Sequence, residues 1–275
     1  MITIGKYNTL TIDHAAMQGL YLTDGKTEIL LPKRYVTHDM LEGNEIRVFV
    51  YNDSEDRPIA TTDVPYAQVD EFAFLEVIAV TEIGAFFDWG LPKDLFMPHS
   101  QKLGRVEIGQ KYMVRVVFDD RSDRIIATVR LRPFFKKEFT TIKQGERVSC
   151  MVYDYREEGI MVILNDLYSA MIHKDEFKSL PAQGETFIGY IKEFLDDGKI
   201  RASLTPATKE ARNDIQDDIL DLLTEADGFL PFNDKSSPED IQRIFGMSKK
   251  MFKKSVGNLY RKHLIKLEDG GIRRI

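Results

Sequence analysis

Two stretches of this chain are close copies of each other: Asp53-Ser-Glu-Asp-Arg57-Pro-Ile-Ala-Thr61 and Asp120-Arg-Ser-Asp-Arg124-Ile-Ile-Ala-Thr128. A fainter third copy follows as Asp196-Asp-Gly-Lys199-Ile-Arg-Ala-Ser203. In each copy an acidic turn leads into a basic residue and then a short run that ends in Ala-Thr or Ala-Ser. The basic residues lie 67 and 75 positions apart. This period is longer than that of most solenoid repeats, so it indicates repeated small domains rather than a stacked array.

The composition is that of a globular protein in a reducing compartment. The 275 residues include one cysteine, Cys150, which excludes an intrachain disulfide. No apolar run approaches the roughly 20 residues that span a bilayer. The start, Met1-Ile-Thr-Ile, lacks the zones of a signal peptide. We therefore expect a cytoplasmic protein with no membrane partner.

The charge is unevenly distributed along the chain. The formal net charge is −6, yet residues 235–275 hold eleven lysines and arginines against four acids, a surplus of +7. The remainder, residues 1–234, carries −13. If the protein has a basic surface for a polyanionic partner, it lies mainly at the C-terminal end.

Residues 1–64 are predicted to form a small all-β domain. Short runs rich in β-branched and aromatic residues alternate with Gly, Asp and Asn punctuation, as strands and turns do. Five strands in about 60 residues, with no long helical pattern, favour a closed barrel of the OB-fold type. The predicted strands are Thr9–Asp13, Gly19–Thr23, Ile29–Pro32, Glu45–Tyr51 and Ile59–Thr62.

Residues 65–135 and 138–206 repeat this pattern and are predicted to be a second and a third OB-fold barrel. In the second, Phe86 and Phe87 are adjacent, so their side chains point to opposite faces of the strand. Phe87 falls in the set with Trp89, and Phe86 in the set with Asp88. The set with an aspartate is expected outside. Phe86 is therefore expected on the surface, where it either stacks on a base or packs against a neighbouring domain.

Residues 207–275 change to a helical period and are predicted to form an α/β winged-helix domain. One helix carries an apolar stripe from Ile215 to Leu223, and Ser237-Pro238 begins a second whose inward face includes Ile241, Ile244 and Phe245. Ser248 caps a third, and a hairpin follows around Asp269-Gly270-Gly271. The third helix has an expected core face of Phe252, Val256, Leu259 and Tyr260.

Four lysines lie at the start of this third helix, which as part of a helix-turn-helix is the one that enters a major groove. They form either a solvated face or a set of contacts to phosphates, which position a nucleic acid without reading its sequence. They are Lys249, Lys250, Lys253 and Lys254.

The second and third regions resemble the OB-fold RNA-binding domain named after ribosomal protein S-one. Position by position, the resemblance implies an RNA-facing role for Phe86, Asp120 and Arg124, whereas Ile83 and Pro98 stand where the family has an aromatic residue and a histidine. In the third region His173 stands at the family's histidine position and Lys199 at its basic position, while Met161 replaces the aromatic residue. Arg57, the basic residue of the repeated turn in the first region, is a further candidate.

Nearly the whole chain resembles the conserved virulence factor B (CvfB) family of bacterial proteins, which combine tandem OB-folds with a C-terminal winged helix. The resemblance is carried by Leu30-Leu31-Pro32, by the run from Asp53 to Thr61, by Lys93-Asp94-Leu95-x-x-Pro98, and by Ser248-Lys-Lys-x-Phe-Lys-Lys-x-Val-Gly257-x-Leu-Tyr260. It implies RNA binding in the service of gene regulation and does not imply an enzyme.

The residues agree that catalysis is not expected. The five histidines and one cysteine have no zinc-ligand spacing, and neither a phosphate-binding Gly-rich loop nor a Gly-x-Ser-x-Gly motif occurs. No cofactor or metal is predicted. The leading hypothesis is a regulator that binds single-stranded RNA. Two alternatives remain: an adaptor for a protein partner with OB-folds that have lost RNA binding, and a winged-helix regulator that binds DNA.

Overall fold

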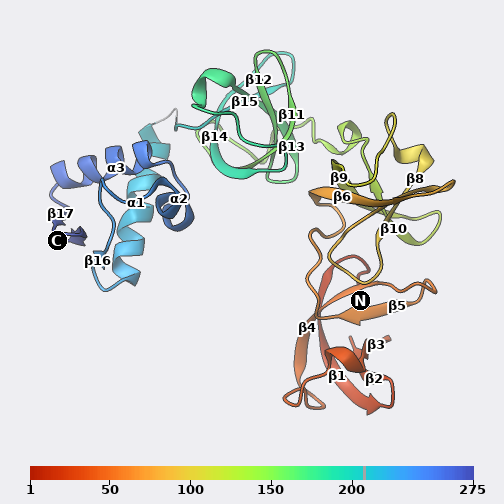
Figure 1. Cartoon of the computed structure of the whole chain (residues 1–275). Coiled ribbons are helices and arrows are strands. Elements are labelled where there is room, and N and C mark those ends of the chain that lie inside the picture. Colours follow the sequence, from red (N-terminus) through yellow and green to blue (C-terminus); the bar gives the residue numbers. More distant parts are fainter. Residues whose placement is uncertain (207–208) are drawn as a thin grey trace. The chain divides into compact units, whose positions relative to one another are not determined.

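The computed structural model confirms the predicted architecture of three five-stranded closed barrels and a winged helix (Figure 1). It describes residues 1–206 and 209–275, so residues 207 and 208 of the predicted fourth domain lie outside the described residues. The chain divides into two compact units, Met1–Phe134 and Phe135–Ile275, which are described one at a time. No helix in the described ranges is long and apolar enough to cross a membrane.

The first unit holds two barrels with the same connectivity, each closed by one parallel pair between its third and fifth strands. In both, the first strand has a register shift, between Ile12 and His14 and between Val77 and Ala79. Such a bulge bends a strand so that it can pair on both sides of a small barrel. The strands of the first barrel are β1 Tyr7–Ala16, β2 Gly19–Thr23, β3 Glu28–Pro32, β4 Glu45–Asn52 and β5 Pro58–Thr61. Those of the second are β6 Phe72–Val80, β7 Gly84–Phe87, β8 Leu95–Pro98, β9 Lys111–Asp119 and β10 Arg124–Thr128.

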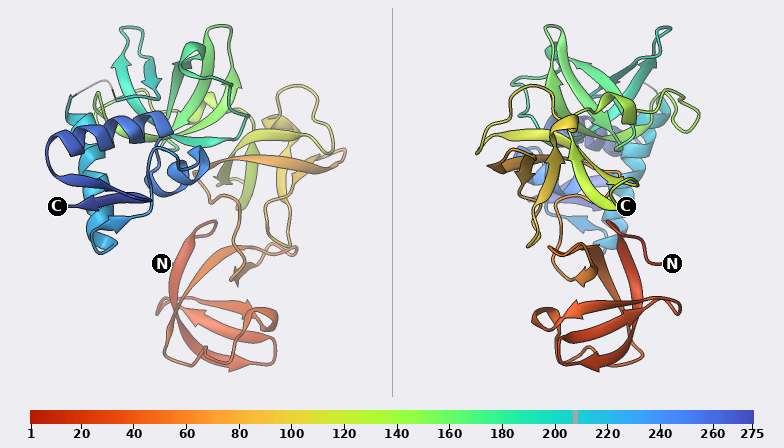
Figure 2. Two further views of the ribbon diagram at one scale, coloured as in Figure 1. Left: turned by 60° about the vertical axis from the view of Figure 1, so that its left-hand side comes forward. Right: turned by 90° about the vertical axis from the view of Figure 1, so that its right-hand side faces the viewer.

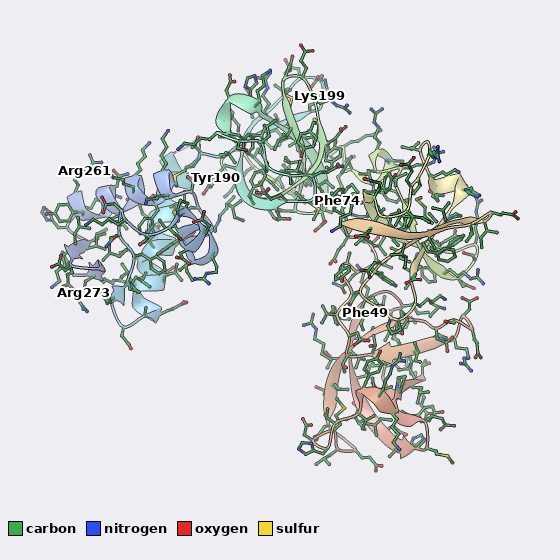
Figure 3. The ribbon with its side chains drawn as sticks, in the orientation of Figure 1. Phe49, Phe74, Tyr190, Lys199, Arg261 and Arg273 are labelled. Carbon is green, nitrogen blue, oxygen red and sulfur yellow. The ribbon has the colours of Figure 1, made fainter. Side chains whose placement is uncertain are left out.

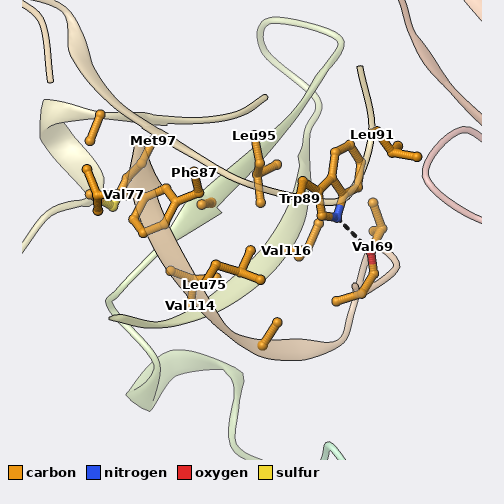
Figure 4. Packing of buried hydrophobic residues seen from close by; sticks show 14 of the residues in the cluster. Val69, Leu75, Val77, Phe87, Trp89, Leu91, Leu95, Met97, Val114 and Val116 are labelled. Atoms are coloured by element: carbon orange, nitrogen blue, oxygen red, sulfur yellow. Dashed lines mark hydrogen bonds between the residues drawn. The ribbon is translucent and has the colours of Figure 1, made fainter. Parts of the chain in front are cut away.

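Every second side chain along the strands points into the barrel and fills its core, as the sequence predicts. Phe87 is fully buried and Trp89 is 3% exposed, and both pack with Leu75, Leu95 and Met97 (Figure 4). The indole nitrogen of Trp89 donates a hydrogen bond of 2.8 Å to the carbonyl oxygen of Ala67. The polar atom of this large side chain is therefore satisfied inside the core.

The second unit begins with the third barrel, which repeats the same strand order and the same bulge, here between Val152 and Asp154. Its core is separate from that of the helical part. Figure 2 shows its strands from two further sides. They are β11 Arg147–Tyr155, β12 Gly159–Leu164, β13 Tyr168–His173, β14 Thr186–Phe194 and β15 Ile200–Ser203. Short 3-10 turns follow the third strand of each barrel at Lys33–Tyr35, His99–Gln101 and Lys174–Glu176, and another lies at Arg132–Phe134.

Two helices of the winged helix begin where the sequence predicts. The Ser237 hydroxyl accepts a hydrogen bond of 3.0 Å from the amide of Asp240, and Ser248 accepts one of 3.3 Å from Met251, so both serines are N-caps. The three short strands form one sheet in the order β16-β18-β17. The elements are α1 Lys209–Glu225, β16 Phe229–Leu230, α2 Pro238–Phe245, α3 Lys249–Arg261, β17 Ile265–Glu268 and β18 Gly271–Arg274.

Two residues predicted for the helical core are exposed instead. Ile244 is 41% exposed and Tyr260 is 51% exposed. Each is next in sequence to a buried residue, Phe245 and Leu259. Because neighbours on a helix point about 100° apart, Phe245 and Leu259 lie within the buried face of their helix, while Ile244 and Tyr260 lie beyond its edge.

One strand position is buried in all three barrels. Phe49, Arg115 and Tyr190 each lie opposite the last Thr or Ser of their barrel, and all three are buried. Phe49 belongs to the core of the second barrel, with its ring 5.7 Å from that of Trp89. Tyr190 belongs to the core of the winged helix (Figure 3). In the first and third barrels, this position thus connects the barrel to the part of its unit that packs against it.

Candidate nucleic-acid interface

Each barrel presents a corresponding pair of residues on the outside of its second and third strands. The pairs are cross-strand neighbours and all their members are half-buried. We call these pairs the outer pairs. They are Tyr21 with Leu30, Phe86 with Phe96, and Met161 with Met171.

A glycine two residues before the first member of each outer pair brings the strands close together. A Cβ atom at Gly19, Gly84 or Gly159 would collide with a carbonyl oxygen of the facing strand, and at Gly84 also with the Phe96 ring. The facing residue on the ladder is Pro32, Pro98 or His173, respectively. Pro98 and His173 therefore occupy equivalent positions, as the resemblance implied.

Phe86 is half-buried rather than freely exposed, because its ring packs against Phe96. The two ring centroids lie 5.1 Å apart at an interplanar angle of 40°. Its neighbour Phe87 points into the core, as the alternation predicted. Phe96 was not among the residues predicted from the sequence. The available signal was the period of two along a strand, which places Phe96 on the face opposite to Leu95 and Met97.

The Phe86–Phe96 pair borders a cleft of about 370 Å³ between the first and second barrels. We call it the inter-barrel cleft. The first barrel lines it with Asn52, Ser54 and Asp56. The second barrel contributes aromatic and apolar side chains, two basic residues and one acid, which include Phe86, Phe96, Trp89, Lys93, Arg124, Ile125 and Asp94.

Arg124 lies in this cleft and binds a residue of the first barrel. Its guanidinium donates to the Asp56 carboxylate, which also accepts a hydrogen bond of 3.1 Å from the ammonium group of Lys93. These two bonds, that of Lys93 first, hold the pKa of Asp56 below its usual range. Lys93 was not a predicted site residue, although it is part of the motif that carried the family resemblance.

The basic residues of the other two repeated turns stay within their own turns. Arg57 binds the Asp53 carboxylate at 2.8 Å and that of Glu55 at 2.9 Å, and Lys199 binds Asp197. Equivalent sequence positions thus make different contacts in the three barrels.

Asp120 is exposed and is not among the residues that line the inter-barrel cleft. In its turn it is Asp119 that accepts a hydrogen bond from Ser122, which lowers the pKa of Asp119. The structure therefore brings Phe86 and Arg124 together in one cleft and leaves Asp120 outside it.

His173 lies at the exposed end of β13. Its Nδ1 accepts a hydrogen bond of 3.3 Å from the backbone amide of Asp175 and lies 3.3 Å from the Asp175 carboxylate. This bond caps the short 3-10 turn that follows the strand. His173 and Lys199 are both accessible, since their side chains are 49% and 73% exposed.

The predicted lysines lie on the outer side of α3, whose other side is buried by Met251, Phe252, Val256 and Leu259. Lys250, Lys253 and Lys254 are exposed, and Lys249 is half-buried. Of these, Lys253 lies 3.8 Å from the Asp234 carboxylate. Figure 3 places Arg261 at the far end of the same helix.

One group of potential metal ligands was not found from sequence spacing. Oxygen and nitrogen atoms of Asp13, His14 and Glu28 lie within 4.8 Å of one another, and all three residues are exposed. The Asp13 carboxylate accepts a hydrogen bond of 2.7 Å from Nδ1 of His14, and this bond raises the pKa of His14. Exposed acidic groups often meet in this way without an ion, so we assign no metal to them.

Comparisons with known proteins agree with this fold. Residues 217–273 match a family described as "CvfB-like winged helix domain", and residues 4–63 match "S1 domain". A conserved virulence factor B of Staphylococcus epidermidis is 32% identical over 84% of this chain and 80% of its own length. The chain belongs to the conserved virulence factor B family.

The chain is also similar to proteins of other bacteria. An uncharacterized protein, YitL, of Bacillus subtilis is 30% identical over 97% of this chain and 92% of its own length. A solved structure from Streptococcus pneumoniae, described as a multidomain protein with nucleic acid binding domains, is 25% identical over 99% of this chain and 98% of its own, with a TM-score of 0.42.

The family assignment bears on the broad class of function. Both matched families are nucleic-acid-binding domains rather than enzymes. The S1 match covers the first barrel, although the second barrel carries the clearer copy of the repeated motif in its sequence.

Proposed function

We propose that this protein is a cytoplasmic regulator that acts after transcription by binding single-stranded RNA, with the outer face of the second barrel as the principal site. The observation that carries the proposal is the Phe86–Phe96 pair beside Lys93 and Arg124 in one cleft. An accessible aromatic ring stacks on an unpaired base, and adjacent cations bind the backbone. No catalytic step and no cofactor are part of the proposal.

The preference for single strands follows from what the aromatic pair can reach. In a duplex the faces of the bases are covered by their neighbours, whereas unpaired bases can leave the stack and lie on a side chain. Asp120, His173, Lys199 and Arg57 are proposed as secondary contacts on the outer faces of the barrels. RNA rather than DNA is favoured by the resemblance to the S-one RNA-binding domain.

The lysines of α3 are proposed to bind phosphates without reading bases. The four lysines Lys249, Lys250, Lys253 and Lys254 carry ammonium groups, which bind phosphates. Among the residues interspersed with and directly after them on α3, Asn258 is suited to hydrogen bonding with a base edge. The winged helix then adds affinity for the same RNA strand.

Titration of the full chain with labelled short single-stranded RNA, single-stranded DNA and duplex DNA of equal length tests this proposal. We expect the tightest binding for single-stranded RNA and the weakest for duplex DNA. Equal or tighter binding of duplex DNA would favour a DNA-binding regulator that uses the winged helix. Binding of none of the three would favour an adaptor for a protein partner.

A further inference from the structure

The turn at residues 53–57 of the first barrel reaches the proposed RNA face of the second. Its Asp56 carboxylate accepts from both Lys93 and Arg124, and the Lys93 ammonium group also donates a bond of 2.6 Å to the carbonyl oxygen of Asp53. The two cations that line the cleft with the aromatic pair are therefore already bound to an acid of the same chain.

The arrangement around Asp56 is that of a phosphate site. A planar guanidinium and a flexible ammonium group that converge on one anion are a common way for proteins to hold a phosphate. Asp56 is ionised at neutral pH, since Lys93 and Arg124 hold its pKa below the usual range. It can therefore compete with a phosphate for both cations.

The contacts that hold Asp56 in place are weak. The side chains of Lys93, Asp56 and Arg124 are 31%, 38% and 51% exposed, and ion pairs at such sites contribute little to stability. The backbone of Asp56 has φ +60° and that of the corresponding Asp123 has φ +53°, a left-handed turn conformation that Asp and Asn tolerate, so the turn itself does not depend on the two ion pairs. An external anion can thus replace the carboxylate at little energetic cost.

Asn52, which lines the same cleft, adds a further reason for the turn to move. It is 7% exposed, and its amide nitrogen donates a hydrogen bond of 3.2 Å to the carbonyl oxygen of Asp56. Its side-chain oxygen is buried and has no hydrogen-bond partner among the described residues. A buried acceptor without a donor is destabilising, and displacement of the turn would let water or a bound strand satisfy it.

We propose that Lys93 and Arg124 form a binding site for a backbone phosphate of a single-stranded nucleic acid, and that Asp56 fills this site until the strand displaces it. The inference rests on the proposed function of the second barrel. The turn at 53–57 is then an internal competitor supplied by the first barrel. It lowers affinity for weak ligands and yields to a strand that also stacks on Phe86.

A purely structural role for the same ion pairs predicts a different result. If Asp56 only fastens the two barrels together, its removal loosens the unit and leaves RNA affinity unchanged or lower. If Asp56 competes with phosphate, its removal raises RNA affinity.

The decisive experiment compares Asp56→Asn with Glu55→Gln in the full chain. Both remove one negative charge from the same turn, but Glu55 binds Arg57 rather than the second barrel. Asparagine tolerates the left-handed conformation, so Asp56→Asn keeps the turn. We expect Asp56→Asn to bind short single-stranded RNA about three- to tenfold tighter, the factor that two exposed ion pairs can supply. Glu55→Gln should change affinity by less than about twofold.

A further variant tests whether the gain depends on the proposed site. In the Asp56→Asn background, Lys93→Gln should remove the gain, because the phosphate loses one of its two cations. A gain that persists in the double variant would overturn the assignment of Lys93.

Fluorescence gives a second readout of the same displacement. Trp89 is the single tryptophan of the chain and lines the cleft. Saturating RNA should change its emission in the wild type and less in Asp56→Asn, where the competitor is already released. Inorganic phosphate and a mononucleotide serve as small-anion probes, and equally tight binding of either to Asp56→Asn would overturn the choice of a polymer strand.

The outcomes separate this inference from the proposed function. If the wild type binds single-stranded RNA and the two charge variants behave alike, the competitor role is wrong while RNA binding stands. If neither the wild type nor Asp56→Asn binds RNA, both proposals fail.

Discussion

The second and third barrels share a scaffold but differ in the chemistry of their outer faces. The outer pair of the second is Phe86 with Phe96, whereas that of the third is Met161 with Met171. The ladder position beside the pair holds Pro98 in the second barrel and His173 in the third. A repeated fold thus preserves the place of a site without preserving its chemistry.

The basic residue of the repeated turn shows the same divergence. Lys199 binds Asp197 of its own turn, while Arg124 binds Asp56 of the first barrel. The sequence of the turn is similar in both cases, so the difference comes from the first barrel packed beside Arg124. The contacts of the basic residue at this position are therefore determined by a neighbour as well as by the barrel itself.

The largest expected effect distinguishes the two faces of β7. Phe87→Ala should lower the free energy of unfolding of the first unit by about 3–5 kcal/mol, because it leaves a cavity in the core. Phe86→Ala should cost roughly 1–2 kcal/mol, since it removes a half-buried ring from one aromatic pair. Urea unfolding followed by Trp89 fluorescence measures both. Equal losses would show that Phe86 is structural.

The next effect compares the outer pairs as RNA sites. Phe86→Ala should weaken binding of single-stranded RNA by about 1–3 kcal/mol, the usual contribution of one stacked base. Met161→Ala, at the equivalent position of the third barrel, should change affinity by less than about twofold. Fluorescence anisotropy with labelled RNA measures both, and the reverse order would transfer the principal site to the third barrel.

A smaller effect concerns the winged helix. Simultaneous replacement of Lys249, Lys250, Lys253 and Lys254 by alanine should reduce the log–log salt slope of RNA binding by up to about 0.7 for each phosphate that no longer binds a lysine. Affinity measured at several salt concentrations gives the slope.

The control for this set removes four exposed lysines from the barrels instead. Replacement of Lys26, Lys33, Lys143 and Lys178 by alanine changes the net charge equally and should leave the slope nearly unchanged. Equal slopes in the two variants would mean that the α3 lysines are only a solvated surface.

The smallest stability effect contrasts the two basic turn residues. Arg124→Ala should shift the melting temperature by less than about 4 °C, because an exposed ion pair contributes about 0–1 kcal/mol. It should nevertheless weaken RNA binding more than Lys199→Ala does. Calorimetry and an RNA titration on both variants give the comparison. A larger thermal shift with unchanged RNA affinity would identify Arg124 as a structural residue and favour the adaptor hypothesis.

Much of the fold could be predicted because its signals are local. Strand alternation placed Phe87 and Trp89 inside, and the caps at Ser237 and Ser248 marked two helix starts. Ile244 and Tyr260 were misassigned because an apolar residue beside the buried stripe differs from it only by its angle around the helix.

The candidate site was only partly predictable because its geometry depends on contacts between barrels. Phe86 and Arg124 were found from the motif. The partners Phe96, Lys93 and Asp56 come from a facing strand, a loop and the preceding barrel, and no local pattern encodes their proximity to the motif. Nor could the turn sequences show that Arg124, unlike Arg57, binds outside its own turn.

The buried position shared by Phe49, Arg115 and Tyr190 has a consequence for synthesis on the ribosome. The first barrel leaves the ribosome before the residues around Trp89 that cover Phe49. At 5–20 residues per second, roughly, this interval is on the order of seconds, during which an apolar ring is uncovered. The third barrel likewise exposes Tyr190 until the winged helix has emerged. During synthesis, each of these two barrels therefore has an apolar ring exposed until the segment translated after it folds and covers that ring.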